Sequence, residues 1–220
     1  MYTLPEISAR RVATKNTCLR PRPFFAIYYK TKDDAFKAAS NTWANVARHT
    51  ESFETSRDML LQIEIASESD FKTAWTEVSR VALKQKLMVW CGHILTHASK
   101  QTDQNDGLEM KSDLGNDGTL RQFEICHLEK LPWAKEGYLL LDGCNTGLVG
   151  GRGWAPANDF ALTQRVLTIG QAGYAYFSSS WNTYSEKSDN SSEVCLWAFR
   201  RGKNDAFGNG ERVLGKSFRY

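Results

Sequence analysis

Cys144 is the residue of this sequence that is best placed to do chemistry. It follows the apolar run 138–141 and enters a glycine-rich loop that begins with Gly143 and Gly147. A thiol becomes a nucleophile when a base lies beside it or when its pKa is lowered. Glycines let the backbone approach a ligand closely, as a site built from main-chain N–H groups requires. Free cysteines are often simple packing residues, so the assignment depends on a partner elsewhere in the chain.

Histidine is the usual base for such a thiol near neutral pH, and the chain contains four histidines. His49 and His127 fall in or beside predicted helices, where surface and packing roles are the usual ones. His97 is the preferred base because it is the last residue before the chain turns polar. His93 precedes an apolar pair inside the same predicted strand and is the runner-up base. A thiol paired with His97 is expected to react well below the pH of about 8.5 that a free thiol requires.

Other site chemistries find little support in the sequence. The five cysteines are odd in number, widely spaced and without a CxxC pair, so neither a disulfide framework nor a thiolate zinc site is expected. The segment GLVGGRG lacks the Lys-Ser/Thr of a phosphate-binding loop, and the acidic residues of 103–117 do not match the spacing of a calcium-binding loop. We therefore expect no metal and no cofactor.

Charge and hydropathy restrict the partners and the location. The net charge is +3, from 28 Lys and Arg against 25 Asp and Glu, which is too small to indicate nucleic acid as a partner. The N-terminus has no apolar core of a signal peptide, and no stretch approaches the roughly 20 apolar residues of a membrane span. We expect no membrane partner, and a protein that is cytoplasmic or exported without a cleaved signal peptide.

The candidate residues must be positioned by secondary structure, which hydrophobic periodicity predicts. In the first half of the chain, strands are predicted at 24–29, 60–65 and 86–96, separated by helices at 32–49 and 69–85. This alternation is typical of an α/β domain with a mostly parallel sheet and helices on both faces. His97 and Cys144 would then lie at the carboxyl edge of the sheet, where ligands bind in open α/β folds.

The second half continues the pattern less regularly. An extended piece is predicted at 107–111, strands at 138–141 and 172–178, and helices at 119–131, 156–169 and 192–200. The 41% hydrophobic content supports one sizeable core. We therefore divide the chain into an N-terminal arm (1–23), one domain (24–201) and a loop-like C-terminal tail (202–220).

The order of these pieces resembles the caspase-like cysteine peptidases, which include caspases, gingipains, legumains and bacterial CHAT-type proteases. In that group the catalytic His closes the third strand and the catalytic Cys closes the fourth, as in HILTHAS and YLLLDGCNTG here. The later segments PANDFALTQRVLTIG and GQAGYAYFSSSWNTY are similar to the helix and cleft-lining strand that follow. The resemblance spans about 24–201 and implies a three-layer caspase-like fold. In this chain Ala98 follows His97 where the group usually has Gly, and Gly143 precedes Cys144 where the group commonly has Ala.

The resemblance also implies roles for particular residues. Cys144 would attack the scissile carbonyl, His97 would protonate the leaving amine, and the N–H groups of Cys144 and Ala98 would form the oxyanion hole. No third, orienting carboxylate is expected. A peptide would lie extended beside the strand that ends at serine, and these residues would bind it: Ser178, Ser179, Ser180, Trp181, Asn182 and Tyr184.

The sequence therefore predicts a cysteine endopeptidase that acts on a protein or peptide through a Cys-His dyad. Two alternatives remain: a catalytically silent caspase-like module that binds a partner through the same cleft, and another Cys-dependent acyl transferase or hydrolase. The resemblance also raises the hypothesis of a bacterial toxin or effector protease, for which an inhibitor or immunity protein would be a further partner.

Overall fold

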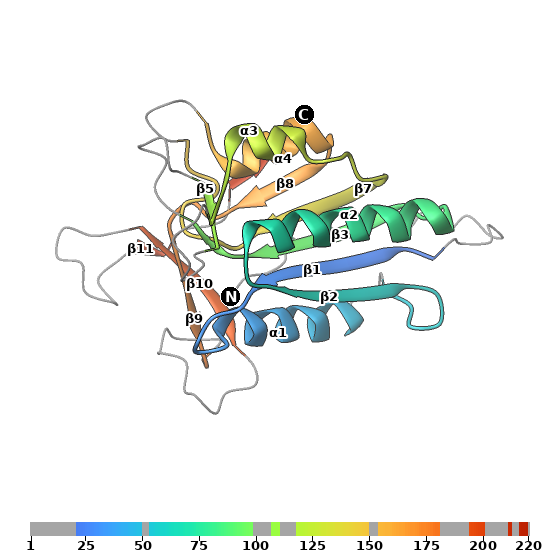
Figure 1. Cartoon of the computed structure of the whole chain (residues 1–220). Coiled ribbons are helices and arrows are strands. Elements are labelled where there is room, and N and C mark those ends of the chain that lie inside the picture. Colours follow the sequence, from blue (N-terminus) through green and yellow to red (C-terminus); the bar gives the residue numbers. More distant parts are fainter. Residues whose placement is uncertain are drawn as a thin grey trace.

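The structure, a computed structural model, describes residues 21–49, 53–98, 107–110, 118–149, 154–180, 194–200, 211–212 and 216–219. It is built on a six-stranded sheet with the strand order β12-β8-β7-β3-β1-β2 (Figure 1). All neighbouring pairs in this sheet are parallel except β8 with β12. The strands of the sheet are β1 (Pro23–Tyr29), β2 (Met59–Ile65), β3 (Val89–Leu95), β7 (Trp133–Leu141), β8 (Leu167–Gly170) and β12 (Lys216–Phe218).

Both faces of the central strands are buried, as their continuous apolar runs predict. In β1, Phe24 and Ala26 belong to one hydrophobic cluster, and Phe25 and Ile27 belong to another. Successive side chains of a strand point to opposite faces, so the two clusters are the two sides of the sheet. The sheet is therefore the middle layer of the molecule.

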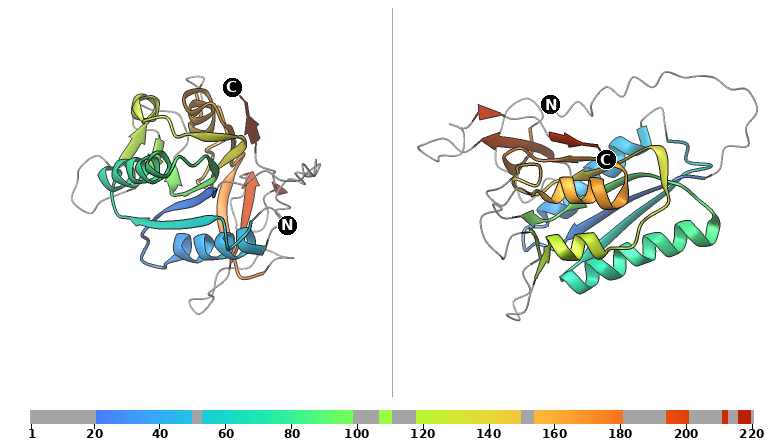
Figure 2. Two further views of the ribbon diagram at one scale, coloured as in Figure 1. Left: turned by 90° about the vertical axis from the view of Figure 1, so that its right-hand side faces the viewer. Right: turned by 90° about the horizontal axis from the view of Figure 1, so that it is seen from above.

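Helices cover these two faces. Helix α1 (Ala35–His49) packs on one face, and α2 (Glu68–Gln85), α3 (Gln122–His127) and α4 (Pro156–Gln164) contribute to the cluster on the other (Figures 1 and 2). This arrangement is a three-layer α/β fold with a mostly parallel central sheet. The predicted fold class is confirmed in these terms.

Two small antiparallel sheets lie beyond the carboxyl ends of the main strands (Figure 1). The first has the order β4-β5-β6, and the second has the order β11-β10-β9. Their strands are β4 (His97–Ala98), β5 (Gly107–Glu109), β6 (Thr119–Arg121), β9 (Tyr174–Ser178), β10 (Cys195–Arg200) and β11 (Glu211–Arg212). These sheets place further side chains and strand edges beside the carboxyl edge of the main sheet.

The structure corrects several predicted elements in the second half. The predicted helix 192–200 is wrong, because Cys195–Arg200 forms β10 and pairs with β9. The predicted helix 119–131 is mostly wrong, because β6 occupies its first residues and only Gln122–His127 is helical. The predicted helix 156–169 is too long: Arg165 adopts a left-handed conformation that ends α4, and β8 follows.

Three further predictions change in extent or place. The predicted third strand, 86–96, is shorter, and His97 belongs to the separate strand β4. The predicted strand 172–178 is β9, which is half-buried and lies in a small sheet. The tail 202–220 is not only loop, because Lys216–Phe218 adds β12 to the main sheet. Of the predicted N-terminal arm, residues 1–20 lie outside the described part.

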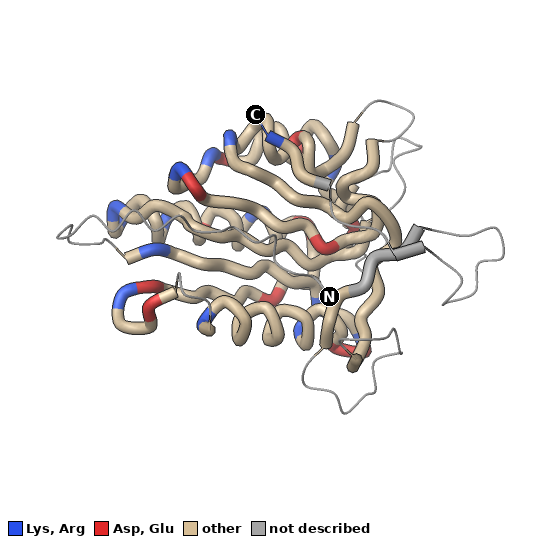
Figure 3. Tube along the Cα trace, turned by 180° about the vertical axis from the view of Figure 1, so that it is seen from behind, with Lys and Arg blue, Asp and Glu red and all other residues tan. Residues whose placement is uncertain are grey.

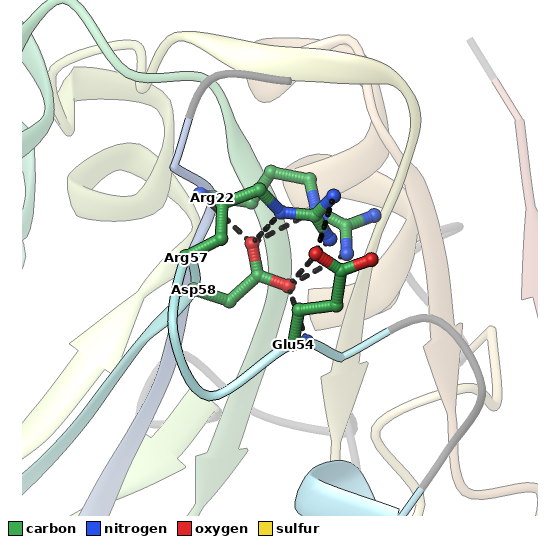
Figure 4. Close-up of polar contacts among 4 residues, drawn as sticks. All are labelled: Arg22, Glu54, Arg57 and Asp58. Carbon is green, nitrogen blue, oxygen red and sulfur yellow. Dashed lines mark hydrogen bonds and ion pairs between the residues drawn. The ribbon is translucent and has the colours of Figure 1, made fainter. Parts of the chain in front are cut away.

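An ion-pair network closes the amino-terminal end of the sheet (Figure 4). The buried carboxylate of Asp58, just before β2, accepts hydrogen bonds from Arg22 Nη2 at 2.7 Å, Arg57 Nε at 2.8 Å and the Glu54 backbone N–H at 2.9 Å. Burial alone would raise the pKa of Asp58, but the hydrogen bonds from Arg57 and Arg22 outweigh it and hold the pKa well below its usual range. This network joins the residues that lead into β1 and β2.

Charged residues elsewhere are mixed in sign. Figure 3 shows that Lys and Arg are interspersed with Asp and Glu along the part of the trace that is described. Among the helices of this part, none is both long and apolar enough to cross a membrane.

Candidate active site

A pocket of about 410 Å³ opens at the carboxyl edge of the main sheet and contains both His97 and Cys144. The residues that line it come from the β1–α1 connection and the start of α1, the β3–β4 segment, the loop after β7 and strand β9. They are Thr31, Asp33, Ala35, Phe36, Thr96, His97, Gly143, Cys144, Ala175, Tyr176 and Phe177. The structure thus brings the two main candidate residues to one pocket.

The loop that carries Cys144 is anchored on both sides. The Asp142 backbone N–H donates to Ile94 O of β3 at 2.8 Å, and the Asn145 N–H donates to Gly173 O at 2.8 Å. Asn145 has a φ of 59°, in the left-handed region, so the chain turns sharply directly after the cysteine. These bonds hold Cys144 between the end of β3 and the segment that leads into β9.

Gly143 allows the chain segment that carries His97 to lie against this loop. A Cβ at position 143 would come within 2.8 Å of Thr96 O and 3.1 Å of Ala98 Cβ. Contacts below 3.0 Å do not occur for real Cβ atoms, so glycine is required here. The space at Gly143 is thus filled by the chain itself, and the space at Gly147 is filled by Gly170. At these two positions the glycines do not leave room for a substrate backbone, contrary to the sequence-based interpretation.

Strand β9 contacts the Cys144 thiol directly. The Ala175 N–H donates to Cys144 Sγ at 3.4 Å, and the thiol lies 4.0 Å from Ala175 O. Burial raises the pKa of Cys144, the Ala175 N–H opposes this, and the negative charge of Glu109 raises the pKa further. This direction is opposite to the expectation of a thiol pKa below the usual value. A base would therefore have to remove the thiol proton during a reaction.

His97 is exposed at the mouth of the pocket. Its ring makes edge contacts with Phe36 at 4.9 Å and with Tyr29 at 6.0 Å between ring centroids. Phe36 in turn packs on Phe177 of β9 at 5.4 Å. These rings link the base, the start of α1 and the strand beside Cys144.

His93, the runner-up base, has a different environment. It is buried, and its Nε2 hydrogen bonds with the carboxylate of Asp142, which also accepts a hydrogen bond from the Gln171 side-chain amide. The ring packs edge-on against Trp43 of α1 at 5.3 Å. His93 is not among the residues that line the pocket. Its position is that of a structural residue which joins β3 to the segments that follow β7 and β8.

The predicted substrate-binding residues are only partly placed. Ser178 is buried, and its hydroxyl accepts a hydrogen bond from the Ser180 N–H at 3.0 Å. Ser178, Ser179 and Ser180 do not line the pocket; the preceding residues of β9, 175–177, do so. Trp181, Asn182 and Tyr184 lie outside the described residues. Ala98 is buried next to Gly143, and it is not a pocket-lining residue.

Sequence reasoning missed two carboxylates near the pair. Asp33 lines the pocket and accepts a hydrogen bond from the Ala35 N–H at the start of α1 at 3.1 Å. Glu109 is the cross-strand neighbour of His97 in the β4–β5 pair. Asp33 follows the first strand at the same carboxyl edge, so the strand-end rule that selected His97 applies to it as well. Nothing in the sequence indicates which residue of β5 lies opposite His97.

No set of three or more His, Cys, Asp or Glu residues in the described part of the chain is arranged to hold a metal ion. The comparisons with known proteins add no family: no protein-family model and no curated protein matches the sequence. The chemical interpretation of the pocket therefore rests on its geometry.

Proposed function

We propose that this protein is a cysteine endopeptidase in which Cys144 is the nucleophile and His97 is the base. The observation that carries the proposal is the pocket at the carboxyl edge of the sheet, which both Cys144 and His97 line together with residues of β9. The order of the two residues, with His97 after β3 and Cys144 after the neighbouring strand β7, matches the caspase-like resemblance.

The edge of β9 offers main-chain groups to an extended substrate. In the described part of the chain, β9 is the outer strand of its sheet and pairs with β10 on one side only. Ala175 directs its N–H and C=O toward Cys144, away from β10. Residues two apart in an antiparallel strand direct these groups to the same side, so Phe177 presents its N–H and C=O along the same edge. A peptide that pairs with these two residues would pass the thiol as an added strand.

The reaction proceeds in two steps. His97 removes the proton from Cys144, the sulfur attacks the scissile carbonyl carbon, the C–N bond breaks, and His97 returns the proton to the leaving amine. Water then attacks the thioester carbon while His97 takes its proton, the C–S bond breaks to release the acid product, and His97 returns the proton to the Cys144 sulfur. We assign stabilisation of the oxyanion to the N–H groups of Cys144 and Ala98.

The test is cleavage of a diverse peptide library by the parent protein and by matched pairs of variants. Cys144→Ala and His97→Ala should abolish cleavage. Cys126→Ala and His127→Ala alter an exposed cysteine and an exposed histidine of α3 and should leave it unchanged. Cleavage that persists in either of the first two variants contradicts the proposal.

A catalytically silent module that binds peptides along the same edge is the second candidate function. It is favoured by the burial of Cys144, which raises the pKa of the thiol and so opposes formation of the thiolate. The same library separates the two: the silent module would retain peptides bound but uncut, with equal affinity in the parent and in Cys144→Ala.

We extend the first proposal to a bacterial effector that cleaves a protein in a target cell and is held inactive by an inhibitor or immunity protein. This extension is supported only by the resemblance to effector-type proteases. Expression of the parent in a candidate target cell should slow growth relative to Cys144→Ala. Equal growth of the two strains would contradict the effector proposal but would not contradict the peptidase proposal.

A further inference from the structure

Glu109 lies directly opposite His97 across an antiparallel strand pair. The β4–β5 register pairs His97 with Glu109 and Ala98 with Leu108. Residues directly opposite in such a pair have their Cβ atoms about 5 Å apart and their side chains on the same face. A glutamate side chain spans this separation and can reach a ring nitrogen of the histidine.

Glu109 is also close enough to the candidate nucleophile to act on it. Its negative charge is one of the influences that raise the pKa of Cys144. The carboxylate is half-buried, so water screens its charge only in part. Glu109, His97 and Cys144 therefore form one electrostatic group, although β5 contributes no residue to the lining of the pocket.

We propose that Glu109 is the positioning residue of the site: it accepts a hydrogen bond from the His97 ring and stabilises the imidazolium that forms when His97 takes the Cys144 proton. This proposal rests on the proposed function for its catalytic consequence. The Glu109 charge stabilises the imidazolium of His97 and destabilises the thiolate of Cys144. The first effect is the larger, because a carboxylate bonded to the ring lies nearer to the imidazolium than to the thiolate. No proton is transferred to Glu109 in the proposed step.

Other titratable groups also face His97 and have to be separated from Glu109. They are Tyr29 of β1, Asp33 before α1, Cys144 after β7 and Tyr176 of β9. Asp33 is the only other carboxylate in this set, and it caps the first turn of α1 through the Ala35 N–H. Glu109 is thus the carboxylate whose place in the strand register aligns it with the His97 ring.

The test compares Glu109→Gln and Glu109→Asp with the matched control Glu136→Gln, an exposed glutamate in the first half of β7. Three quantities are measured for each protein: the pKa of His97 by NMR titration of the ring, the pH dependence of Cys144 alkylation by iodoacetamide, and kcat on a cleaved library peptide. The His97 signal is assigned by its loss in His97→Ala.

Glu109→Gln should lower the pKa of both His97 and Cys144 and reduce kcat at least about tenfold, with KM unchanged. Glu109→Asp keeps the charge and should restore both pKa values toward those of the parent. Glu136→Gln should match the parent in all three measurements. A His97 pKa that does not change in Glu109→Gln overturns the proposal, and so does a rise in KM limited to cationic peptides, which would place Glu109 on the substrate.

The design separates this proposal from the proposed function. If the parent cleaves no peptide, the peptidase proposal fails, while the two pKa measurements still decide whether Glu109 acts on His97. If the parent cleaves and Glu109→Gln cleaves equally well, only the role of Glu109 fails. Circular dichroism and thermal melting report whether Glu109→Gln folds. If it does not fold, Glu109→Asp provides the answer.

Discussion

At the scale of single residues, Gly143 has a strict steric requirement beside the site. The missing Cβ lets Thr96 O, one residue before His97, lie against the Cys144 loop. This close approach gives a physical reason for glycine at position 143. The geometry of the pocket therefore depends on one absent methyl group.

Gly143→Ala tests this dependence. The added methyl group must push Thr96 away, since a backbone carbonyl cannot move aside as a side chain can. We expect a loss of about 2 kcal/mol in the free energy of unfolding and a marked fall in any peptidase activity. Urea unfolding followed by circular dichroism measures the first quantity. Unchanged stability would mean that the two segments are not in contact.

The two candidate histidines should differ in what their removal does to stability. His93→Ala leaves the buried Asp142 carboxylate without one of its donors and should cost about 2 kcal/mol. His97→Ala removes an exposed ring and should change stability by less than about 0.5 kcal/mol. Thermal melting of the two variants is the measurement. Equal destabilisation would contradict the structural role assigned to His93.

At the scale of elements, helix α2 shows how local sequence fixes a boundary. Ser67 caps its first turn by accepting a hydrogen bond from the Asp70 N–H at 3.1 Å. Lys86 ends it in the left-handed conformation, with a φ of 55°. A residue other than glycine is strained in that conformation, so this helix end is not at its stability optimum.

Lys86→Gly should therefore raise the free energy of unfolding by about 1 kcal/mol. Lys84→Gly, two residues earlier in the last turn of the same helix, should lower it by about 1 kcal/mol. Both variants remove the same exposed side-chain type, so the opposite signs isolate the effect of the backbone conformation. Chemical denaturation of both proteins checks the pair, and a loss in Lys86→Gly would contradict the expectation.

The elements of the first half could be predicted from sequence, because their periodicity and their burial agree. The runs 24–29 and 60–65 are apolar and short, as in a buried strand, and 69–85 has one apolar stripe, as in a helix. Each pattern therefore fits only one type of secondary structure. The helix predicted at 192–200 is strand β10 because it pairs with β9, a partner that local pattern does not reveal. Strand β8 was missed because its apolar residues continue the helical pattern of α4 past the turn at Arg165.

At the scale of the whole molecule, the Asp58 network (Figure 4) lies where β1 and β2 begin, and the site lies beyond the ends of β1, β3 and β7. Because these strands are parallel, the two occupy opposite ends of the sheet. The network holds the entries to β1 and β2 together by ion pairs from Arg22 and Arg57. Because it is remote from the pocket, it affects stability and leaves the chemistry unchanged. The effect of acid on folding stability can therefore be measured separately from the effect of acid on the site.

Asp58→Asn should cost about 3 kcal/mol at neutral pH, because two arginines lose a buried carboxylate. The folded-state pKa of Asp58 lies below the value of about 3.9 for an unfolded chain, so its stabilisation is complete above that pH and is lost as the pH falls through the folded-state pKa. The stability difference between the parent and Asp58→Asn should therefore be constant from about pH 5 to pH 7 and shrink in stronger acid. Denaturant titrations at several pH values measure it, and a difference that grows toward low pH would have the wrong sign.

The candidate site was predictable in its two main residues and in little else. His97 and Cys144 were found because both follow apolar strands, and the carboxyl ends of parallel strands meet at one edge. Glu109 and the edge of β9 depend on antiparallel pairings in the two small sheets. Such pairings join residues distant in sequence, and no periodicity encodes them.

The buried bonds among His93, Asp142 and Gln171 carry one more consequence. They join β3 to the segments that follow β7 and β8, directly beneath the loop that presents Cys144. Asp142 takes part in both bonds, so opening the end of β7 breaks its bonds to His93 and to Gln171, and opening the end of β3 or β8 breaks one of them. The backbone amides around them should therefore exchange with heavy water as one cooperative unit and at one rate, so that Cys144 is either held in place or released together with this edge of the sheet.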